Sequence, residues 1–223
     1  MKMKSLKIAI ASLVLATSFH SSATIIASTD FDGRIVSGNT ASNLTWNLNG
    51  ISSPGDLSAD SDLFTTSAAN NLFAVDSNLV QDSPWEVNIA LNVLATNNIA
   101  LSSVTLNAFI LNNNGMFQSV ERHLDINASI FAMPTTLLSS VDESVYANGN
   151  GFTNGADVSF DFTGVSLLAG NSYFLKLTAT GERLGNNAGF DNLVINGDVT
   201  AVPEPSALAM LALGIMGLAS RRL

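Results

Sequence analysis

The feature that most limits the fold is an alternation of apolar and polar side chains along the middle of the chain. From Trp85 to Val93, apolar residues occupy every second position, and polar or small residues fill the positions between them. Similar patterns occur at residues 44–48, 123–130, 157–162 and 173–179. Because side chains alternate between the two faces of a β-strand, each segment predicts a strand with one buried face.

The turns and the remaining apolar segments complete an all-β prediction. Residues 104–111 are apolar at most positions and predict a strand in the middle of a sheet, and 192–199 predict the last strand. Asn-Gly pairs, which favour tight turns, occur at 49–50, 114–115, 148–149, 150–151, 154–155 and 196–197. The pair at 114–115 predicts a hairpin. The expected fold is a single antiparallel β-sandwich with jelly-roll-like topology.

The N-terminus has the three parts of a secretory signal peptide, which implies passage through the secretion translocon. Lys2, Lys4 and Lys7 give it a positive start, and the apolar run 8–16 follows. Small residues at 21 and 23 then predict cleavage between Ala23 and Thr24. An uncleaved membrane anchor is the alternative, although the run is shorter than the ~20 residues that a span needs.

The C-terminus predicts a short membrane-spanning helix over residues 206–220. Its apolar run 207–219 follows Pro203-Glu204-Pro205 and precedes Arg221 and Arg222. Arginines stay on the cytoplasmic side, as do the lysines of the signal peptide, so the middle of the chain faces outward. About 15 helical residues span only ~22 Å of a ~30 Å hydrocarbon core, so the anchor is marginal and suits transient attachment to the inner membrane.

These C-terminal residues resemble a known sorting signal. Pro203-Glu204-Pro205, a short glycine-containing apolar helix and the pair Arg221-Arg222 are similar to the PEP-CTERM signal of exported bacterial proteins. The resemblance implies processing by an exosortase, delivery to the cell envelope, outer surface or medium, and an association with biofilm and exopolysaccharide. A plain tail anchor is the alternative. The expected parts are 1–23 as signal peptide, 24–200 as the exported sandwich and 201–223 as sorting segment.

A second resemblance concerns the end of the sandwich. Residues 160–175, with Ala169-Gly170-Asn171-Ser172-Tyr173 before a strand, and 189–194, with Asp191-Asn192 opening the final strand, are similar to galactose-binding-like and carbohydrate-binding jelly rolls. The resemblance covers about 40 residues. It implies the jelly-roll topology more than it implies sugar binding, because function depends on the site rather than on the fold.

Composition excludes several classes of protein. Residues 24–202 hold 17 acidic and 4 basic side chains, a net charge of −13, so the chain does not suit nucleic acid. The chain has no cysteine, which excludes disulfides, thiolate zinc sites and cysteine nucleophiles. His123, on an outward strand position, is the one histidine of the exported part, and no Gly-x-Ser-x-Gly motif occurs. We therefore expect no enzymatic activity, although pairs of carboxylates leave a secreted hydrolase open.

Two groups of aspartates are candidate calcium ligands, because calcium takes several oxygen ligands. Asp30 and Asp32 could meet Asp191, a pairing implied by jelly rolls whose first and last strands hold a structural calcium. The second group comprises Asp56, Asp60 and Asp62. All six residues also suit solvent-exposed turns, so both interpretations stay open.

The loop 142–157 is the candidate glycan site. Tyr146 and Phe152 could supply aromatic surfaces, and the neighbouring asparagines could supply amides. The aromatics could equally turn inward, and we assign Trp46 and Trp85 to the core. The sequence as a whole predicts an exported, envelope-sorted β-sandwich with a structural or adhesive role in the matrix or exopolysaccharide layer. A carbohydrate-binding module is the alternative and a secreted hydrolase the third.

Overall fold

The computed structural model describes residues 23–66, 71–76, 84–118, 122–147, 155–181 and 187–202, together with Leu213. The described residues contain fourteen strands. These are β1 (Thr24–Thr29), β2 (Ile35–Ser37), β3 (Thr40–Ser42), β4 (Asn47–Leu48), β5 (Leu57–Ser58), β6 (Phe73–Ala74), β7 (Trp85–Asn92), β8 (Asn97–Leu111), β9 (Arg122–Ala132), β10 (Thr136–Ala147), β11 (Ala156–Asp161), β12 (Ser166–Leu167), β13 (Ser172–Gly181) and β14 (Asn187–Ala201). The all-β prediction is confirmed.

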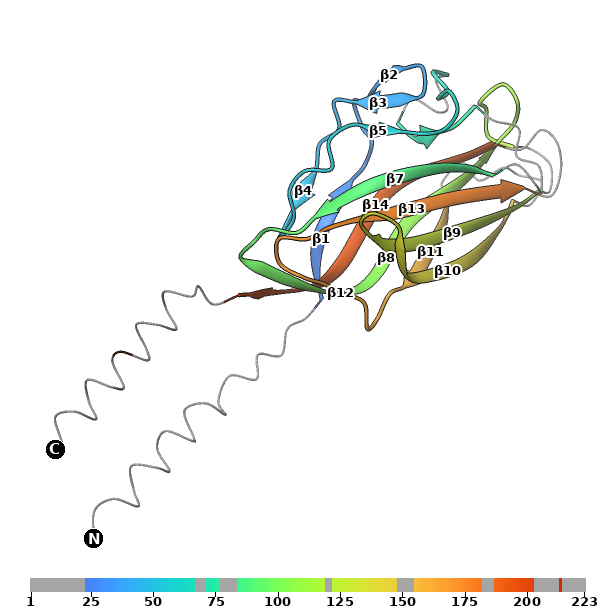
Figure 1. Cartoon of the computed structure of the whole chain (residues 1–223). Coiled ribbons are helices and arrows are strands. Elements are labelled where there is room, and N and C mark those ends of the chain that lie inside the picture. Colours follow the sequence, from blue (N-terminus) through green and yellow to red (C-terminus); the bar gives the residue numbers. More distant parts are fainter. Residues whose placement is uncertain are drawn as a thin grey trace, which may run out of the picture.

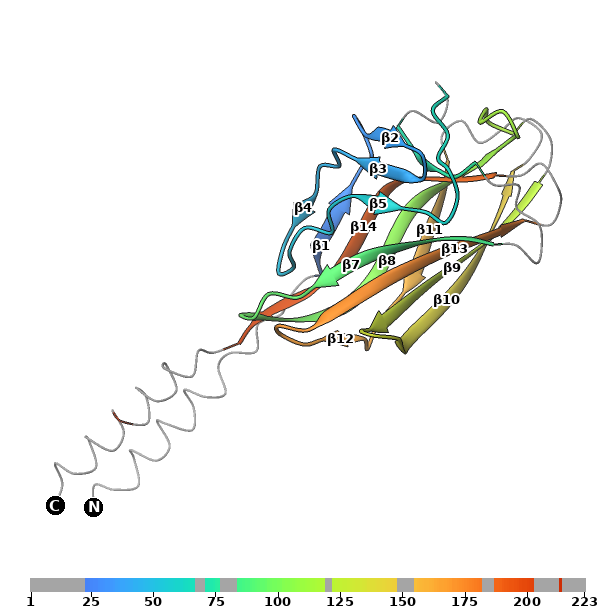
Figure 2. The same cartoon turned by 45° about the horizontal axis from the view of Figure 1, so that its top comes forward.

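The strands form three antiparallel sheets. The largest has seven strands in the order β11-β8-β14-β1-β4, with β12 also paired to β8 and β6 to β14. The second has four strands in the order β10-β9-β13-β7, and it faces the first across the core (Figures 1 and 2). The third comprises β2, β3 and β5. The β-sandwich is confirmed, the small third sheet was not predicted, and the jelly-roll topology stays a prediction.

The core lies between the two larger sheets, where the alternating apolar residues of facing strands meet. Trp85 is fully buried, and its ring lies 5.1 Å from that of Phe190 and 6.4 Å from that of Phe73, measured between centroids. Trp46, which we assigned to the core, is only partly buried, and its Nε1 donates a hydrogen bond to Gly55 O at 3.1 Å. It packs at the margin because it immediately precedes β4, which lies at the edge of the sheet.

The prediction of a hairpin at Asn114-Gly115 is right about the turn, but wrong in pairing the two long strands on either side of it. Gly115 has a φ of +69°, and Leu111 and Phe117 form a short antiparallel bridge around the turn. However, the strands on either side, β8 and β9, belong to different sheets and are not paired. The turn therefore carries the chain from one layer of the sandwich to the other.

Both ends of the described sandwich lie at the same place. β1 begins beside the last part of β14, with Thr24 opposite Gly197, and the backbone N–H of Val202 donates to Thr96 O at 2.7 Å. The β7–β8 turn and the β12–β13 turn lie at this end too (Figures 1 and 2). We call it the terminal end. The opposite end, which includes the start of β14 at Asn187 and the end of β8 at Leu111, is the far end.

The predicted terminal helices lie outside the described residues, apart from Leu213. Within the described part of the chain, no helix is long and apolar enough to cross a membrane. The signal peptide, the helix over 206–220 and the domain boundaries therefore stay predictions. Thr24, the first residue after the predicted cleavage point, is the first residue of β1.

Candidate functional site

The register of β1 against β14 decides where the first group of candidate carboxylates lies. Thr29 pairs with Leu193, so Asp30 and Asp32 follow β1 beside an irregular part of β14, between Asp191 and Val194. Asn192 adopts a positive φ of 49° at this β-bulge, a conformation that asparagine tolerates better than most residues. The structure thus brings together the end of the first strand and the bulge of the last one.

This placement changes the pKa of Asp191. Burial raises its pKa to about 6 from the ordinary value of 3.8, and repulsion from Asp32 and Asp30 acts in the same direction. The backbone N–H of Asn192, which donates to Asp191 Oδ1 at 2.7 Å, opposes the rise in pKa. The three predicted carboxylates therefore lie within electrostatic range of one another.

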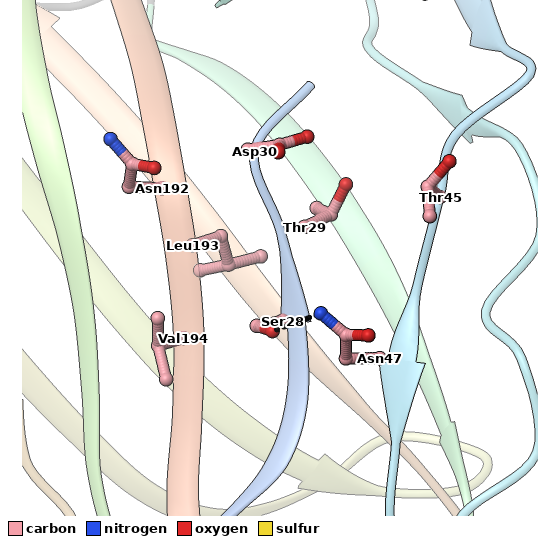
Figure 3. Close-up of a pocket in the computed structure, with 8 residues that line it drawn as sticks. All are labelled: Ser28, Thr29, Asp30, Thr45, Asn47, Asn192, Leu193 and Val194. Carbon is pink, nitrogen blue, oxygen red and sulfur yellow. Dashed lines mark hydrogen bonds between the residues drawn. The ribbon is translucent and has the colours of Figure 1, made fainter. Parts of the chain in front are cut away.

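A small pocket adjoins this group of carboxylates. It is lined by Ser28, Thr29, Asp30, Thr45, Asn47, Asn192, Leu193 and Val194 (Figure 3). Its volume of about 160 Å³ is below the ~300–1,000 Å³ of small-molecule sites, so it suits water or an ion better than a sugar. Within the described residues, however, no three His, Asp or Glu side chains are grouped so that they could hold a metal ion. Calcium at Asp30, Asp32 and Asp191 stays a prediction.

The raised pKa makes a pH-dependent prediction. Folded Asp191 keeps its proton up to about pH 6, whereas an unfolded chain loses it near pH 3.8, so stability falls as the pH rises through that interval. Asp191→Asn removes the charge and can still accept the hydrogen bond from Asn192. We expect it to raise the Tm at pH 7 by ~2–4 °C, about 1 kcal/mol once solvent screening is allowed for. Thermal melts from pH 4 to pH 7 test this.

Asp161→Asn is the matched control. Hydrogen bonds from Thr163 lower the pKa of this exposed carboxylate, so its charged form is favoured in the folded protein. The control should not raise the Tm at pH 7. Equal melting profiles of wild type and Asp191→Asn across the whole pH range would contradict the prediction.

The other predicted site residues are not brought into this group. Asp56 precedes β5, and Asp60 and Asp62 follow it. The backbone of Tyr146 pairs with His123, but its side chain and Phe152 lie outside the described residues, so the glycan loop stays a prediction. His123 was expected to be a solvated surface side chain, but it is only 11% exposed. Its Nε2 lies 3.0 Å from Asp125 Oδ1.

The outer face of the four-stranded sheet carries a second candidate site, which was not predicted. Phe131 of β9 and Phe174 of β13 lie opposite each other, and their rings stack at 4.8 Å between centroids and 8° between planes. Lys176 Nζ lies 5.6 Å from the centre of the Phe131 ring and 3.2 Å from Glu86 Oε2. The face therefore presents an aromatic pair beside charged groups, which we call the phenylalanine platform.

A cavity adjoins the platform toward the terminal end. Its volume is about 400 Å³, within the range of small-molecule sites. Asn88 and Asn92 of β7, Met133, Pro134 and Ser172 are among the residues that line it, together with Ala90, Tyr173 and Phe174. The exposed side chains of Asn88 and Asn92 supply amide donors and acceptors next to the ring of Phe174.

Polar groups on the other side of the platform form a connected network. Asn127 Nδ2 donates to Ser140 Oγ at 2.7 Å and to Asp142 Oδ1 at 2.8 Å. Ser129 Oγ donates to Asn127 Oδ1 at 2.6 Å, which fixes the orientation of that amide. The outer face thus combines a stacked aromatic pair with ordered hydroxyl, amide and carboxylate groups.

The alternation pattern did contain a sign of this platform. In 173–179 the apolar positions are odd-numbered, so Phe174 is an aromatic residue on the polar face. A single outward apolar side chain is common, so Phe174 gains meaning only when it forms a patch with a neighbour. The pairing with Phe131 could not be read locally, because it depends on the register between β9 and β13.

Comparisons with known proteins identify one segment of the chain. Residues 201–222 match the model of the PEP-CTERM protein-sorting motif, so the resemblance drawn from Pro203-Glu204-Pro205 and the arginine pair is confirmed. The motif implies export to the envelope or cell surface, with processing by an exosortase. A search of curated proteins found no match.

Solved structures that align with this chain include carbohydrate-binding modules. TmCBM61, solved with β-1,4-galactotriose, is 10% identical with a TM-score of 0.35, covering 76% of this chain and 91% of its own. The family 11 module of Clostridium thermocellum is 11% identical with a TM-score of 0.36, covering 77% and 96%. The mannan-recognising TmCBM27 is 10% identical with a TM-score of 0.35, covering 80% and 99%. Likenesses this weak say nothing about what this chain binds.

Proposed function

We propose that this chain is an exported matrix protein that adheres to polysaccharide at the cell surface and acts by binding rather than by catalysis. The PEP-CTERM motif at residues 201–222 supports delivery to the envelope. It adjoins the sandwich directly, since its first residue, Ala201, is the last residue of β14. The secretion translocon would export the chain, and an exosortase would then process the tail after transient anchoring in the inner membrane. The exopolysaccharide layer is the proposed destination.

The observation that favours polysaccharide is the phenylalanine platform. The rings of Phe131 and Phe174 stack on each other and are partly exposed, so one face of each ring is covered by the other. Phe174 also lines the cavity, where its other face can pack against the C–H face of a sugar ring. The amides of Asn88 and Asn92 lie beside it and can bond sugar hydroxyls. A cavity of about 400 Å³ that is open to solvent suits a segment of a chain passing along the face.

Removing the two rings tests the proposed adhesion. We expect Phe131→Ala combined with Phe174→Ala to weaken binding to the host's isolated exopolysaccharide at least tenfold, or ~1.4 kcal/mol. Affinity electrophoresis or calorimetry with the purified polysaccharide measures it, and a glycan array identifies the sugar. Circular dichroism checks that the variant is folded.

Phe117→Ala is the matched control. It also removes one ring of an interacting phenylalanine pair, since Phe109 and Phe117 lie 5.6 Å apart, but the pair lies at the far end. We expect it to leave binding unchanged. Equal binding by the platform variant and wild type would overturn the platform as the adhesive surface, and turnover of the polysaccharide would instead favour the hydrolase interpretation.

A further inference from the structure

Large apolar side chains are exposed at the terminal end of the sandwich. Leu94 in the β7–β8 turn is 43% exposed, Leu168 in the β12–β13 turn 54%, and Met133 in the β9–β10 turn 57%. Leu137 and Leu138, at the start of β10, are 53% and 41% exposed. We call these five residues the apolar rim. At the far end, the described residues with comparable exposure are Ile35 and Met116.

Hydrogen bonds join the three turns of the rim into one surface. The N–H of Met133 donates to Ser172 O at 3.1 Å, and the N–H of Val93 donates to Asn171 O at 3.0 Å. The N–H of Asn171 in turn donates to Leu168 O at 3.2 Å. The turns therefore lie side by side at the end from which the chain leaves, as the two views agree (Figures 1 and 2).

The chain that leads to the apolar tail leaves the sandwich beside the rim. Val202 is tied to Thr96, two residues after Leu94, and the apolar run begins at Ala207. Five residues of extended chain span at most ~18 Å. With the tail in a bilayer, the terminal end must therefore stay within about that distance of the hydrocarbon, whose headgroup layer is itself ~5–7 Å thick.

The distribution of charge agrees with this orientation. Along the strands of the seven-stranded sheet, Asp198 is the described acid nearest the terminal end. Asp161, opposite Ser103, is the next acid along this sheet, and Asp30, Asp32, Asp157 and Asp191 lie toward the far end, beside the second half of β8 or beyond the end of β1. Since anionic lipids repel carboxylates, the end with exposed apolar side chains and few acids is the one suited to a membrane.

We propose that the apolar rim lies in the headgroup layer of the membrane that holds the C-terminal tail, so that the sandwich stands on lipid at its terminal end. The inference rests on the proposed anchoring of the tail. It places the far end of the 15-residue strand β8 ~50 Å from the bilayer.

Because the chain has no cysteine, single cysteines can report on this contact. The full chain carrying Leu168→Cys or Met133→Cys, each labelled with an environment-sensitive fluorophore, is reconstituted in phosphatidylethanolamine–phosphatidylglycerol vesicles. Met116→Cys, 46% exposed at the far end, is the matched control. We expect blue-shifted emission at 168 and 133 and quenching by headgroup-labelled lipid several-fold above that at 116. Adding Leu94→Asp should reduce the quenching at 168.

The outcomes of this experiment distinguish the lipid contact of the rim from the anchoring of the tail. Water-like emission at both rim positions, in a chain that sediments with the vesicles, would overturn the lipid contact, leave the anchor standing and favour a protein partner for the rim. A chain that does not sediment with the vesicles would overturn the anchoring and the lipid contact together.

Discussion

A chain in which Pro203-Glu204-Pro205 is replaced by three alanines is expected to keep its C-terminal tail in the cell that exports it. The three replaced residues lie beyond β14, whose last residue is Ala201, so the change alters the recognition segment without touching a strand. We expect an essentially complete loss of processing, with the protein accumulating in the membrane fraction. Mass spectrometry of the protein from each fraction measures it.

Thr200→Ala is the control for this experiment. Thr200 is exposed, and its hydroxyl makes one long hydrogen bond to Asn98 O at 3.4 Å, so its loss should change neither folding nor processing. Normal tail removal from the triple-alanine chain would refute the sorting interpretation and favour a plain tail anchor.

The largest expected effect on stability is that of Trp85→Ala. Trp85 is 0% exposed and lies between Phe73 and Phe190, where the β7 strand faces the seven-stranded sheet. Deleting a buried aromatic side chain leaves a cavity and costs about 3–5 kcal/mol. Against a typical total of ~5–15 kcal/mol, that loss removes a large part of the stability. Chemical denaturation of the purified chain measures it.

Trp85→Phe separates packing from hydrogen bonding. Within the described residues, the indole Nε1 is buried and meets no acceptor, so the tryptophan leaves a donor unsatisfied. Phenylalanine removes that donor and keeps most of the aromatic contact, so we expect a loss of less than ~1.5 kcal/mol. A loss as large as that of the alanine variant would contradict this account of the core.

The strands that alternation predicted are those with one buried and one exposed face. Residues 85–93 and 173–179 correspond to β7 and β13. Each of these strands has one face packed into the core between the two larger sheets, and its buried positions therefore alternate with more exposed ones. β10 went unrecognised because its segment from Thr136 to Ser144 is largely exposed on both faces. β7 is an edge strand of the same sheet too, but one of its faces is buried, so its pattern is visible in the sequence.

Of the two candidate sites, one was anticipated from the sequence and the other was not. That Asp30 and Asp32 lie near Asp191 was anticipated from the resemblance to jelly rolls whose first and last strands meet, and the register of β1 on β14 produces it. The platform of Phe131 and Phe174 was not anticipated, since it depends on pairing between segments 43 residues apart. Local sequence shows which face a side chain takes, but only the register shows its neighbour on that face.

The position of β14 has a mechanical consequence. A sandwich attached through its C-terminus and gripping the matrix with its outer face carries tension along β14, which is paired with β8 on one side and β1 on the other. Antiparallel hydrogen bonds run across the strand direction, so a pull along β14 shears many of them at once instead of opening them one by one. The same architecture that places the last strand in the middle of a sheet would let the domain resist flow.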